Sequence, residues 1–508
     1  MSRFGGPTLA RGKTADVTLL LEGTYPFVSG GVSSWVHQII RGLPEIEFAL
    51  VFLGGSPDAY EKIRYELPKN VVHLEEHFLG EVPKAQRILG IPGDAAFYAN
   101  SAELHDEMAA NGDGLGRMLS GVVKSLIDDP ARHERDFLFS EAAWQEVCHR
   151  YETSSPSRSF LEYFWTVRSM HAPLFKMARV AAALPPSKAF HVISTGFAGF
   201  LGMLANKKRN VPLILTEHGI YAKERRIELL QASWIRDDDD DAPELGGIGF
   251  FRQMWIRFFE ALAKMSYAAA DPIVALYEGN RQRQIRDGAD GARTRVVPNG
   301  IDLARFAALR EQRTTAVPRV LGLIGRVVPI KDIKTFVRAL RVVVTEMPDV
   351  EGWIVGPDDE DKSYAEECRH LVASLGLEKS VKFLGFRKVD DIFPKIGLNV
   401  LTSISEAQPL VVLEGFAAGV PCVSSDVGCV RELLEGVGAD DRAFGIGGSI
   451  VDIANPEATA RAAMNLLRDP DRWHAAQAAG FARTSSIYTQ DLMLDRYRKI
   501  YMTAIGKG

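Results

Sequence analysis

The sequence has little cysteine, no excess of charge of one sign and no long hydrophobic run. Its four cysteines, Cys148, Cys368, Cys422 and Cys429, show no paired CxxC spacing, which argues against a zinc ribbon and fits a reducing compartment. The 60 basic residues nearly balance 65 acidic ones, whereas a general nucleic-acid binder is basic as a whole. No window approaches about 18 uninterrupted apolar residues, as a membrane-spanning helix requires. The N-terminal stretch MSRFGGPTLARGKTAD lacks the apolar core of a signal peptide. These absences predict a cytoplasmic protein that does not bind nucleic acid.

What the chain does have is the composition of a globular protein. Its 508 residues are 46% hydrophobic and 25% charged, which is average for such proteins. At roughly 150 residues per domain, the length predicts two to four domains. Domains of this size bury enough apolar surface to need no disulfide or metal for stability.

The first half of the chain alternates short apolar runs with helical patterns. Val17–Leu21 is predicted as a buried strand, and a loop with Gly30 and Gly31 leads from it to a helix that begins near Ser33. Strand, glycine loop and helix form the opening unit of a doubly wound α/β domain. Further strands are predicted at Phe48–Leu53, Val71–Leu74, His191–Ser194, Val211–Thr216 and Pro272–Leu276. The stretch from about 80 to 180 has few strand signals and predicts a helical insertion whose role the sequence does not indicate.

A second series of strands and helices begins near Arg319 and predicts a second parallel-sheet domain. The polar stretch 303–318 is the best candidate for a linker between the two series, and Asp491–Ile505 is predicted as an amphipathic helix. Strands are predicted at Val320–Ile324, Glu351–Val355, Val381–Leu384, Leu398–Leu401 and Cys422–Ser424, and helices at 331–345, 362–374, 409–418 and 456–467.

A run of five aspartates, Asp237–Asp241, contains a D-x-D pattern. Such a pattern holds a metal and a diphosphate in some transferases. The run follows no predicted strand, and like charges repel one another, so a solvated loop is the favoured interpretation.

Two glutamates with a fixed spacing are the most informative feature of the sequence. Glu406 follows a predicted strand, and Glu414 lies eight residues later inside a predicted helix among apolar side chains. Pro409 suits the first turn of that helix. Because an unpaired buried charge is costly, Glu414 needs hydrogen-bond donors, and sugar hydroxyls would serve. Gly419 ends the helix and Pro421 opens the next strand.

This E-x7-E spacing, followed by F-A-A-G-x-P, resembles the signature of family 4 of the retaining glycosyltransferases with the GT-B fold. Three other stretches match that family in its order: the glycine loop Ser29–Val32, the N-G-x-D stretch Arg295–Asp302 with Phe306, and the G-R…K stretch Gly325–Asp332. The resemblance covers residues 16 to about 435. It implies an α/β fold of two Rossmann-like domains, each a doubly wound parallel sheet, that face each other across a cleft.

The resemblance also implies a division of labour between domains. Residues 1–302 would form an N-terminal acceptor-side domain that contains the helical insertion of about 80–180. Residues 303–485 would form the domain that binds the nucleotide sugar, and a C-terminal helix in 486–508 would return to the N-terminal domain.

Two cations and two glycines are candidates for phosphate binding. Arg326 and Lys331 follow a strand, where an α/β domain opens its ligand crevice, and together they can clamp a diphosphate. The alternative is a surface pair bonded to the acidic helix that follows. Gly30 and Gly31 precede a helix, so their backbone can approach a phosphate at its positive end. The alternative is an ordinary turn.

The family's pattern places the remaining donor contacts. Glu414 would hold the ribose hydroxyls of the nucleotide. His218 would contact the transferred sugar, or else be satisfied by backbone. The hydroxyls of the donor sugar would be held by Glu406 and the segment of Ala407, Gln408, Pro409 and Leu410.

The function implied is that of a retaining hexosyltransferase that needs no cofactor and no metal, since Arg326 and Lys331 supply the positive charge. The stretches Leu21–Val36 and Thr216–Tyr221, with the helical insertion, resemble most closely the cytosolic glycosyltransferases of the Pel exopolysaccharide pathway. That resemblance implies a UDP-sugar donor, a growing polysaccharide or other glycan as acceptor, and a membrane synthase complex that holds the protein at the inner membrane. UDP-glucose is favoured, and a UDP-N-acetylhexosamine is the second candidate.

Two other functions stay open from the sequence. One is another GT-B activity, such as a glycogen-synthase-like transferase or a nucleotide-sugar epimerase. The other is a catalytically idle scaffold that binds a nucleotide sugar within a membrane synthase. The presence of Arg326, Lys331, Glu406 and Glu414 together favours an enzyme over a scaffold.

Overall fold

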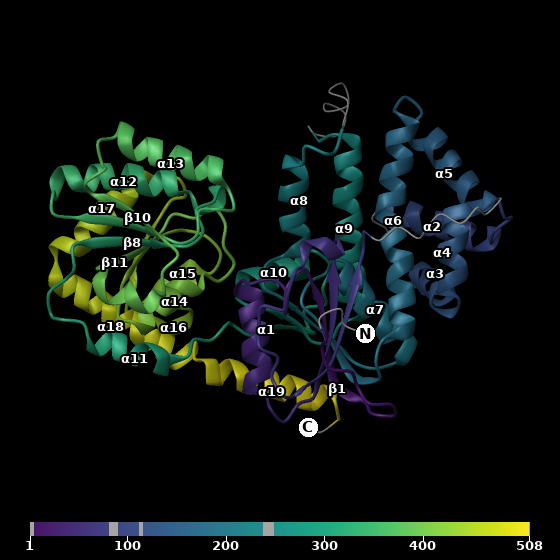
Figure 1. Cartoon of the computed structure of the whole chain (residues 1–508), viewed down its shortest axis with the longest axis horizontal. Coiled ribbons are helices and arrows are strands. Elements are labelled where there is room, and N and C mark those ends of the chain that lie inside the picture. Colours follow the sequence, from purple (N-terminus) through teal and green to yellow (C-terminus); the bar gives the residue numbers. More distant parts are fainter. Residues whose placement is uncertain (1–4, 81–89, 111–114, 237–247, 507–508) are drawn as a thin grey trace. The chain divides into compact units, whose positions relative to one another are not determined.

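The computed structural model describes residues 5–80, 90–110, 115–236 and 248–506. The chain forms two compact units, each built on a parallel sheet (Figure 1). Unit 1 contains Met1–Ala275, Arg281–Val296 and Tyr497–Gly508, and unit 2 contains Leu276–Asn280 and Val297–Arg496. The aspartate run Asp237–Asp241 lies outside the described residues.

Among the described residues, unit 1 has a seven-stranded sheet in the order β3-β2-β1-β4-β5-β6-β7, with all neighbours parallel. The order reverses between β1 and β4, which makes this pair the topological switch point. The central strands are buried along nearly their whole length, because helices cover both faces of such a sheet. The strands are β1 (Ala15–Glu22), β2 (Phe48–Gly54), β3 (Val71–Phe78), β4 (Ser187–Val192), β5 (Leu213–Glu217), β6 (Ile273–Ala275) and β7 (Thr294–Val296).

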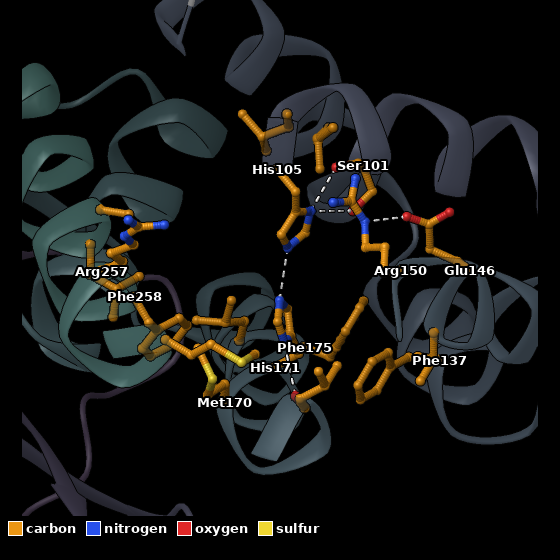
Figure 2. Close-up of a pocket in the computed structure, with 18 of the residues that line it drawn as sticks. Ser101, His105, Phe137, Glu146, Arg150, Met170, His171, Phe175, Arg257 and Phe258 are labelled. Atoms are coloured by element: carbon orange, nitrogen blue, oxygen red, sulfur yellow. Dashed lines mark hydrogen bonds and ion pairs between the residues drawn. The ribbon is translucent and has the colours of Figure 1, made fainter. Parts of the chain in front are cut away.

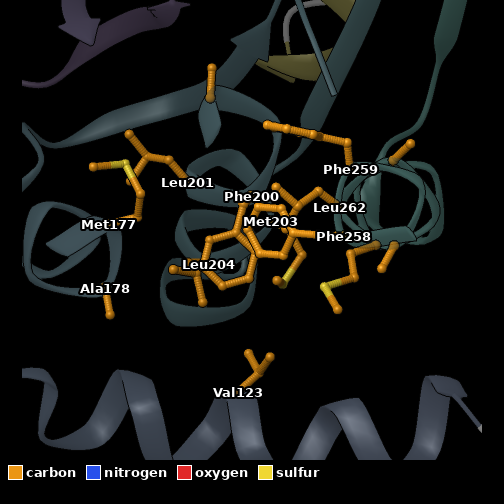
Figure 3. Packing of buried hydrophobic residues seen from close by; sticks show 14 of the residues in the cluster. Val123, Met177, Ala178, Phe200, Leu201, Met203, Leu204, Phe258, Phe259 and Leu262 are labelled. Carbon is orange, nitrogen blue, oxygen red and sulfur yellow. The ribbon is translucent and has the colours of Figure 1, made fainter. Parts of the chain in front are cut away.

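Helices α6 to α9 share a large apolar core in unit 1. Helix α7 is buried from Ala198 to Ala205, and it packs against α6 and α9 (Figure 3). Phe200, Met203 and Leu204 of α7 meet Phe258 and Leu262 of α9 in this core. The helices of the Rossmann part are α1 (Gly31–Gly42), α7 (Phe197–Arg209), α8 (Tyr221–Gln231), α9 (Phe250–Ala269) and α10 (Glu278–Arg286).

Where the sequence predicts a helical insertion, the described residues form helices α2 to α6. The side chains of Asp129, Ser140 and Ser159 cap three of them by accepting hydrogen bonds from backbone N–H groups. The longest, α6, packs on α7 and so joins the insertion to the Rossmann core. The bounds are α2 (Ala95–Ala110), α3 (Leu115–Asp128), α4 (Pro130–Phe139), α5 (Glu141–Ser154) and α6 (Phe160–Ala183).

Unit 2 has a six-stranded parallel sheet in the order β10-β9-β8-β11-β12-β13, counted over described residues. Its switch point lies between β8 and β11. The strands are β8 (Val320–Ile324), β9 (Glu351–Val355), β10 (Val381–Gly385), β11 (Leu398–Leu401), β12 (Cys422–Ser425) and β13 (Gly448–Val451). The α-helices are α11 (Leu303–Glu311), α12 (Ile333–Glu346), α13 (Lys362–Ser374), α14 (Leu410–Ala417), α15 (Val430–Glu435), α16 (Gly438–Arg442), α17 (Pro456–Arg468) and α18 (Pro470–Ile487).

The boundary between the units differs from the predicted one. The chain leaves unit 1 after Val296, not after residue 302. The predicted linker 303–318 contains helix α11, and its Phe306 and Leu309 are buried in the core of unit 2. The polar residues that suggested a linker lie on either side of these two anchors, most of them after Leu309 at the end of the helix and in the segment that follows it.

The last helix, α19 (Gln490–Ala504), belongs to unit 2 up to Arg496 and to unit 1 from Tyr497. Two of its tyrosines bond to strand ends of the first sheet: Tyr501 Oη lies 2.7 Å from Nδ1 of His191, and Tyr497 Oη lies 3.1 Å from Oγ1 of Thr216. All four cysteines are free thiols. Among the described residues, no helix has the length and hydrophobicity that crossing a membrane requires.

Candidate functional site

Two loops at the switch point of unit 2 carry most of the predicted donor-binding residues. Strands β8 and β11 are parallel neighbours, so their carboxyl ends open at the same edge of the sheet. Arg326 and Lys331 follow β8, and Glu406 follows β11. In open α/β sheets, ligands bind in the crevice at this position.

Hydrogen bonds join the two loops directly. The hydroxyl of Thr402 donates to the carbonyl of Lys331 at 2.9 Å, and the backbone N–H of Ile404 donates to the carbonyl of Ile330 at 2.9 Å. Lys331 ends a short 3₁₀ turn, η3 (Pro329–Lys331), and the Asp332 side chain then caps α12. The backbone that presents Lys331 is therefore fixed on both sides.

Lys331 and Glu406 form an ion pair at this edge of the sheet. The Lys331 Nζ lies 2.5 Å from Glu406 Oε1, and the side chains are 19% and 15% exposed. The hydroxyl of Ser403 donates to the same carboxylate oxygen at 2.7 Å. The structure thus brings together two predicted site residues that are 75 positions apart.

The segment after Glu406 turns its carbonyls toward the start of α15. The Ala407 carbonyl accepts from the N–H of Cys429 at 2.9 Å. Gly428 has a φ of +56°, and a Cβ there would lie 2.3 Å from the Ala407 carbonyl oxygen and 2.4 Å from that of Glu406. Because C=O and N–H point in opposite directions across a trans peptide, the N–H groups of Ala407 and Gln408 point away from α15.

Two buried polar atoms in the same region lack a partner. The Oε1 of Gln408 accepts from the backbone N–H of Asn299 at 2.8 Å, which leaves Nε2 of Gln408 and Oδ1 of Asn299 buried and unpaired among the described residues. Buried polar groups without a partner are costly and call for an explanation. A polar ligand at this place would satisfy both.

Glu414 lies on α14, which begins at Leu410 with Pro409 at its N-cap, one position before the predicted first turn. Burial raises the pKa of Glu414 to about 7, against the opposing effect of nearby Arg305. Arg305 itself is paired with Asp390 at 3.0 Å. A carboxylate in so dry a setting favours neutral hydrogen-bond donors, such as the hydroxyl groups of a ribose.

Arg326 is placed differently from Lys331. Its side chain is 56% exposed, and its guanidinium lies 2.6 Å from the carboxylate of Glu360 in the acidic turn after β9. The alternative interpretation from the sequence was an ion pair between Arg326 and an acidic helix at the surface. The observed contact is such a surface ion pair, but Glu360 lies in the turn before α13 and not in the helix. The guanidinium of Arg326 is therefore already neutralised in this structure, and an anionic ligand must compete with Glu360 for it.

The predicted residues of unit 1 follow two of its strands. Gly30 is the N-cap of α1, with a φ of 168° that any residue can adopt. A Cβ at Gly30 or at Gly31 would have no atom within 4 Å. Backbone strain at Gly30 does not require glycine, and neither does packing at Gly30 or Gly31. The remaining physical reason for glycine at these positions is that a ligand can approach the backbone amides closely.

His218 follows β5 and packs edge-on against Trp35, with ring centroids 4.7 Å apart. Burial lowers the pKa of His218 to about 4, so its imidazole is neutral at physiological pH. Its Nε2 is buried without a partner among the described residues. A neutral imidazole can donate or accept a hydrogen bond to a sugar, but it cannot supply a positive charge.

Three residues of the site received no role from the sequence, namely Ser403, Asn299 and Glu360. Ser403 begins the stretch that carries the two glutamates, and Asn299 lies in the N-G-x-D stretch. Their places in these two motifs could have indicated that both residues belong to the site. Glu360 lies in an acidic run, and only the tertiary fold brings its carboxylate to Arg326. No spacing rule in the sequence connects these two.

Comparison with known proteins identifies the families of both units. Residues 15–292 match DUF3492, described as a domain of unknown function, and this match spans more than half of the chain. The chain belongs to the DUF3492 family. In addition to the DUF3492 region, residues 318–469 match glycosyl transferases group 1, and they include Arg326, Lys331, Glu406 and Glu414.

Curated and solved relatives of this DUF3492 member are glycosyltransferases and a sucrose-phosphate synthase. D-inositol 3-phosphate glycosyltransferase of Thermobispora bispora is 26% identical over 324 residues, which is 61% of this chain and 69% of the relative. Anabaena HepE, solved with UDP and glucose, superposes with a TM-score of 0.57 at 15% identity, covering 96% of this chain and 100% of HepE. Sucrose-phosphate synthase of Thermosynechococcus elongatus gives 0.56 at 16% identity, covering 97% and 100%. The chain is a hexosyltransferase with the GT-B fold of two Rossmann-like domains.

Proposed function

We propose that this enzyme transfers a hexose from a UDP-sugar to a growing exopolysaccharide with retention of anomeric configuration, as the PelF-type transferases that its sequence resembles would do. The observation that carries the proposal is the Lys331–Glu406 pair at the switch point of a group 1 glycosyltransferase unit. HepE has been solved in complex with UDP and glucose and with UDP-glucose, which supports UDP-glucose ahead of a UDP-N-acetylhexosamine. The proposal places the enzyme in the cytosol, docked to a membrane synthase through partners.

In this proposal the cations act on the leaving group. Departure of the diphosphate from the anomeric carbon develops negative charge on its oxygens. In this scheme Lys331, whose backbone is held by contacts with the neighbouring loop, shifts its ammonium group from Glu406 to the diphosphate, and Arg326 joins it after exchanging Glu360 for phosphate. The amides of Gly30 and Gly31 add a backbone contact to phosphate from unit 1. No metal enters the proposal, because the two side chains supply the positive charge.

The sugar and the nucleoside would be held by different glutamates. Glu406 and the outward N–H groups of Ala407 and Gln408 bind hydroxyls of the donor sugar, with Leu410 and Pro409 closing the turn. Nε2 of Gln408 gains a partner in the same step. Glu414 accepts hydrogen bonds from the ribose hydroxyls, and His218 contacts the transferred sugar as a neutral group.

The proposed transfer needs no general base from the protein. The acceptor hydroxyl oxygen bonds to the anomeric carbon as the bond from that carbon to the diphosphate oxygen breaks. The hydroxyl proton passes to the departing phosphate oxygen on the same face of the sugar. Glu406 is not a nucleophile in this scheme, and its contacts with Lys331 and Ser403, both through Oε1, hold the carboxylate in place.

Stereochemistry tests the proposed reaction. The anomeric configuration of the product, followed by NMR from a UDP-sugar of known configuration, is expected to equal that of the donor. An inverted product would contradict the retaining scheme. The donor itself is first chosen by thermal shift across a panel of nucleotide sugars, because a ligand at 100 times its Kd stabilises the fold by about 2.7 kcal/mol.

The raised pKa of Glu414 predicts that nucleotide affinity falls in acid. Burial holds this pKa at about 7 in the free enzyme, and binding to ribose hydroxyls favours the ionised form. Affinity for UDP is therefore expected to weaken as the pH falls through about 7, because the carboxylate becomes protonated. The measurement is the Kd of UDP by calorimetry across this range.

The matched variant is Glu414→Gln, which keeps the size of the side chain and removes its titration. The ratio of the two dissociation constants cancels the titration of the diphosphate itself. A ratio that stays constant across the pH range would show that Glu414 does not bind the nucleotide.

The Arg326–Glu360 contact predicts a variant with tighter donor binding. Glu360→Gln removes the internal competitor for the guanidinium, and a surface ion pair is worth about 0.2–1 kcal/mol, so UDP is expected to bind up to about fivefold more tightly at low salt. Calorimetry of UDP binding measures the change. Glu367→Gln, which breaks the exposed Lys334–Glu367 pair elsewhere in unit 2, is the control. Equal or weaker binding to the Glu360→Gln variant would refute the role of Arg326.

A further inference from the structure

The helical insertion and α9 enclose a cavity of about 580 Å³ in unit 1 (Figure 2). This volume lies within the range of about 300–1,000 Å³ that small-molecule sites have. Most of its wall is apolar, and Figure 2 shows Phe137, Met170, Phe175 and Phe258 around the space. The donor-site residues discussed above do not line it, so it calls for a separate explanation.

Of the polar groups labelled in Figure 2, His105, His171, Arg150 and Glu146 are bonded to one another or to backbone, whereas Arg257 has no bond to the residues drawn. Nε2 of His105 lies 2.9 Å from Nε2 of His171, and each ring also bonds to a backbone carbonyl of its own helix. Arg150 pairs with Glu146 at 2.5 Å and with Asp106 at 3.1 Å. With these groups paired, the wall offers an incoming molecule mainly hydrocarbon and aromatic surface. The part of a ligand that enters this cavity should therefore be apolar.

A second cavity of about 630 Å³ adjoins the first, since Val123 of α3 and Met265 of α9 line both. Figure 3 shows Val123 projecting from α3 toward the α7 core. The second cavity is lined by three lysines, Lys124, Lys207 and Lys208, against one acidic residue, Asp128. Lys208 donates to the Ile127 carbonyl, and all three lysines are exposed. An apolar space thus continues into one with an excess of positive charge.

We propose that the two cavities together form a binding site for a molecule with one acyl chain and one anionic group. The chain occupies the apolar cavity, and the anionic group lies beside Lys124 and Lys207. Hydrophobic burial supplies most of the affinity, and the lysines set the orientation and the preference for negative charge. A free fatty acid and a single-chain phospholipid share this chemistry. The inference assigns a role to the insertion and does not depend on the donor or the acceptor of the transferase.

Dodecanoate tests the proposal, with dodecyltrimethylammonium as a probe of equal chain length and opposite charge. Calorimetry on the full-length protein, below the concentrations at which either probe forms micelles, is expected to show saturable binding of dodecanoate and much weaker binding of the cation. Dodecanoyl lysophosphatidylglycerol, measured in parallel, shows whether the site prefers a carboxylate or a phosphodiester, and tight binding of either anion supports the proposal.

Two variants locate the bound probe. Lys124→Glu with Lys207→Glu reverses two exposed charges and is expected to weaken dodecanoate binding about tenfold, whereas Lys62→Glu, an exposed lysine elsewhere in unit 1, leaves it unchanged. Val123→Trp fills the junction and is expected to abolish binding, with circular dichroism as the check on folding. Equal binding of the anionic and cationic probes, no binding of dodecanoate, or unchanged binding to the double lysine variant would overturn the proposal.

Discussion

Lys331→Ala is expected to lower the rate of sugar transfer by about 10²–10³, the usual cost of removing one group that stabilises developing charge. The ammonium group of Lys331 is mostly buried, paired with Glu406 and presented by a backbone that is bonded on both sides. Its charge is therefore already positioned before the donor binds. Removing it takes away the positive charge and leaves the Glu406 carboxylate with the Ser403 hydroxyl as its hydrogen-bond donor. Steady-state rates with saturating donor measure the effect.

Lys334→Ala is the control for this substitution. Lys334 lies one turn further along the same segment, and its partner is the exposed Glu367. Both variants are expected to unfold cooperatively, and the control is expected to keep wild-type transfer. If Lys331→Ala is folded and transfers at a rate near wild type, the assignment of the diphosphate to this lysine is wrong.

Gly30→Ala is the second substitution with a large expected effect. An added methyl group meets no protein atom within 4 Å, and the φ of 168° suits alanine. The melting temperature of the variant is therefore expected to be close to that of the wild type. The same methyl would stand between the donor phosphate and the amides at the start of α1. A displacement of about 1 Å in a reacting group costs about 10² in rate, and a loss of this order in kcat/KM is expected.

The matched change is Gly121→Ala on α3, where an added Cβ likewise meets no atom within 4 Å. It should leave kcat/KM unaltered. Wild-type kinetics for Gly30→Ala would mean that the glycine loop forms a turn and does not contact the donor. Loss of folding in Gly30→Ala would instead contradict the open space found at this position.

The sequence predicts the strands of unit 2 well because they are short, apolar and bounded by turn residues. β8, β9 and β11 have the predicted bounds, and β12 differs by one residue. β7 and β13 were missed, since Thr294–Val296 and Gly448–Val451 are too short and mixed to give a hydrophobic pattern. The predicted strand His191–Ser194 was placed too late, because β4 runs from Ser187 to Val192 and its first residues are partly polar.

For the site, the sequence identified residue types but not their pairing. The spacing of Glu406 and Glu414 on a strand, loop and helix was readable, as was the place of Lys331 after a strand. The Lys331–Glu406 contact depends on β8 and β11 being neighbours, which is a property of the sheet order. The Arg326–Glu360 contact and the cavity of the insertion arise from tertiary packing of helices and loops far apart in the chain. Local patterns hold no information on such contacts.

Release of UDP is the most direct test of the account. Wild-type enzyme and Lys331→Ala are each incubated with UDP-glucose or UDP-N-acetylglucosamine, and with GDP-mannose as a control for the nucleotide base. Each reaction is run with and without glycan acceptors, and the free nucleoside diphosphate is measured. The wild-type enzyme is expected to release UDP from a UDP-hexose, and faster with acceptor, whereas release by the variant is expected to be lower by about 10²–10³. Binding of UDP-sugars without any release by the wild type, or equal release by both proteins, would contradict it.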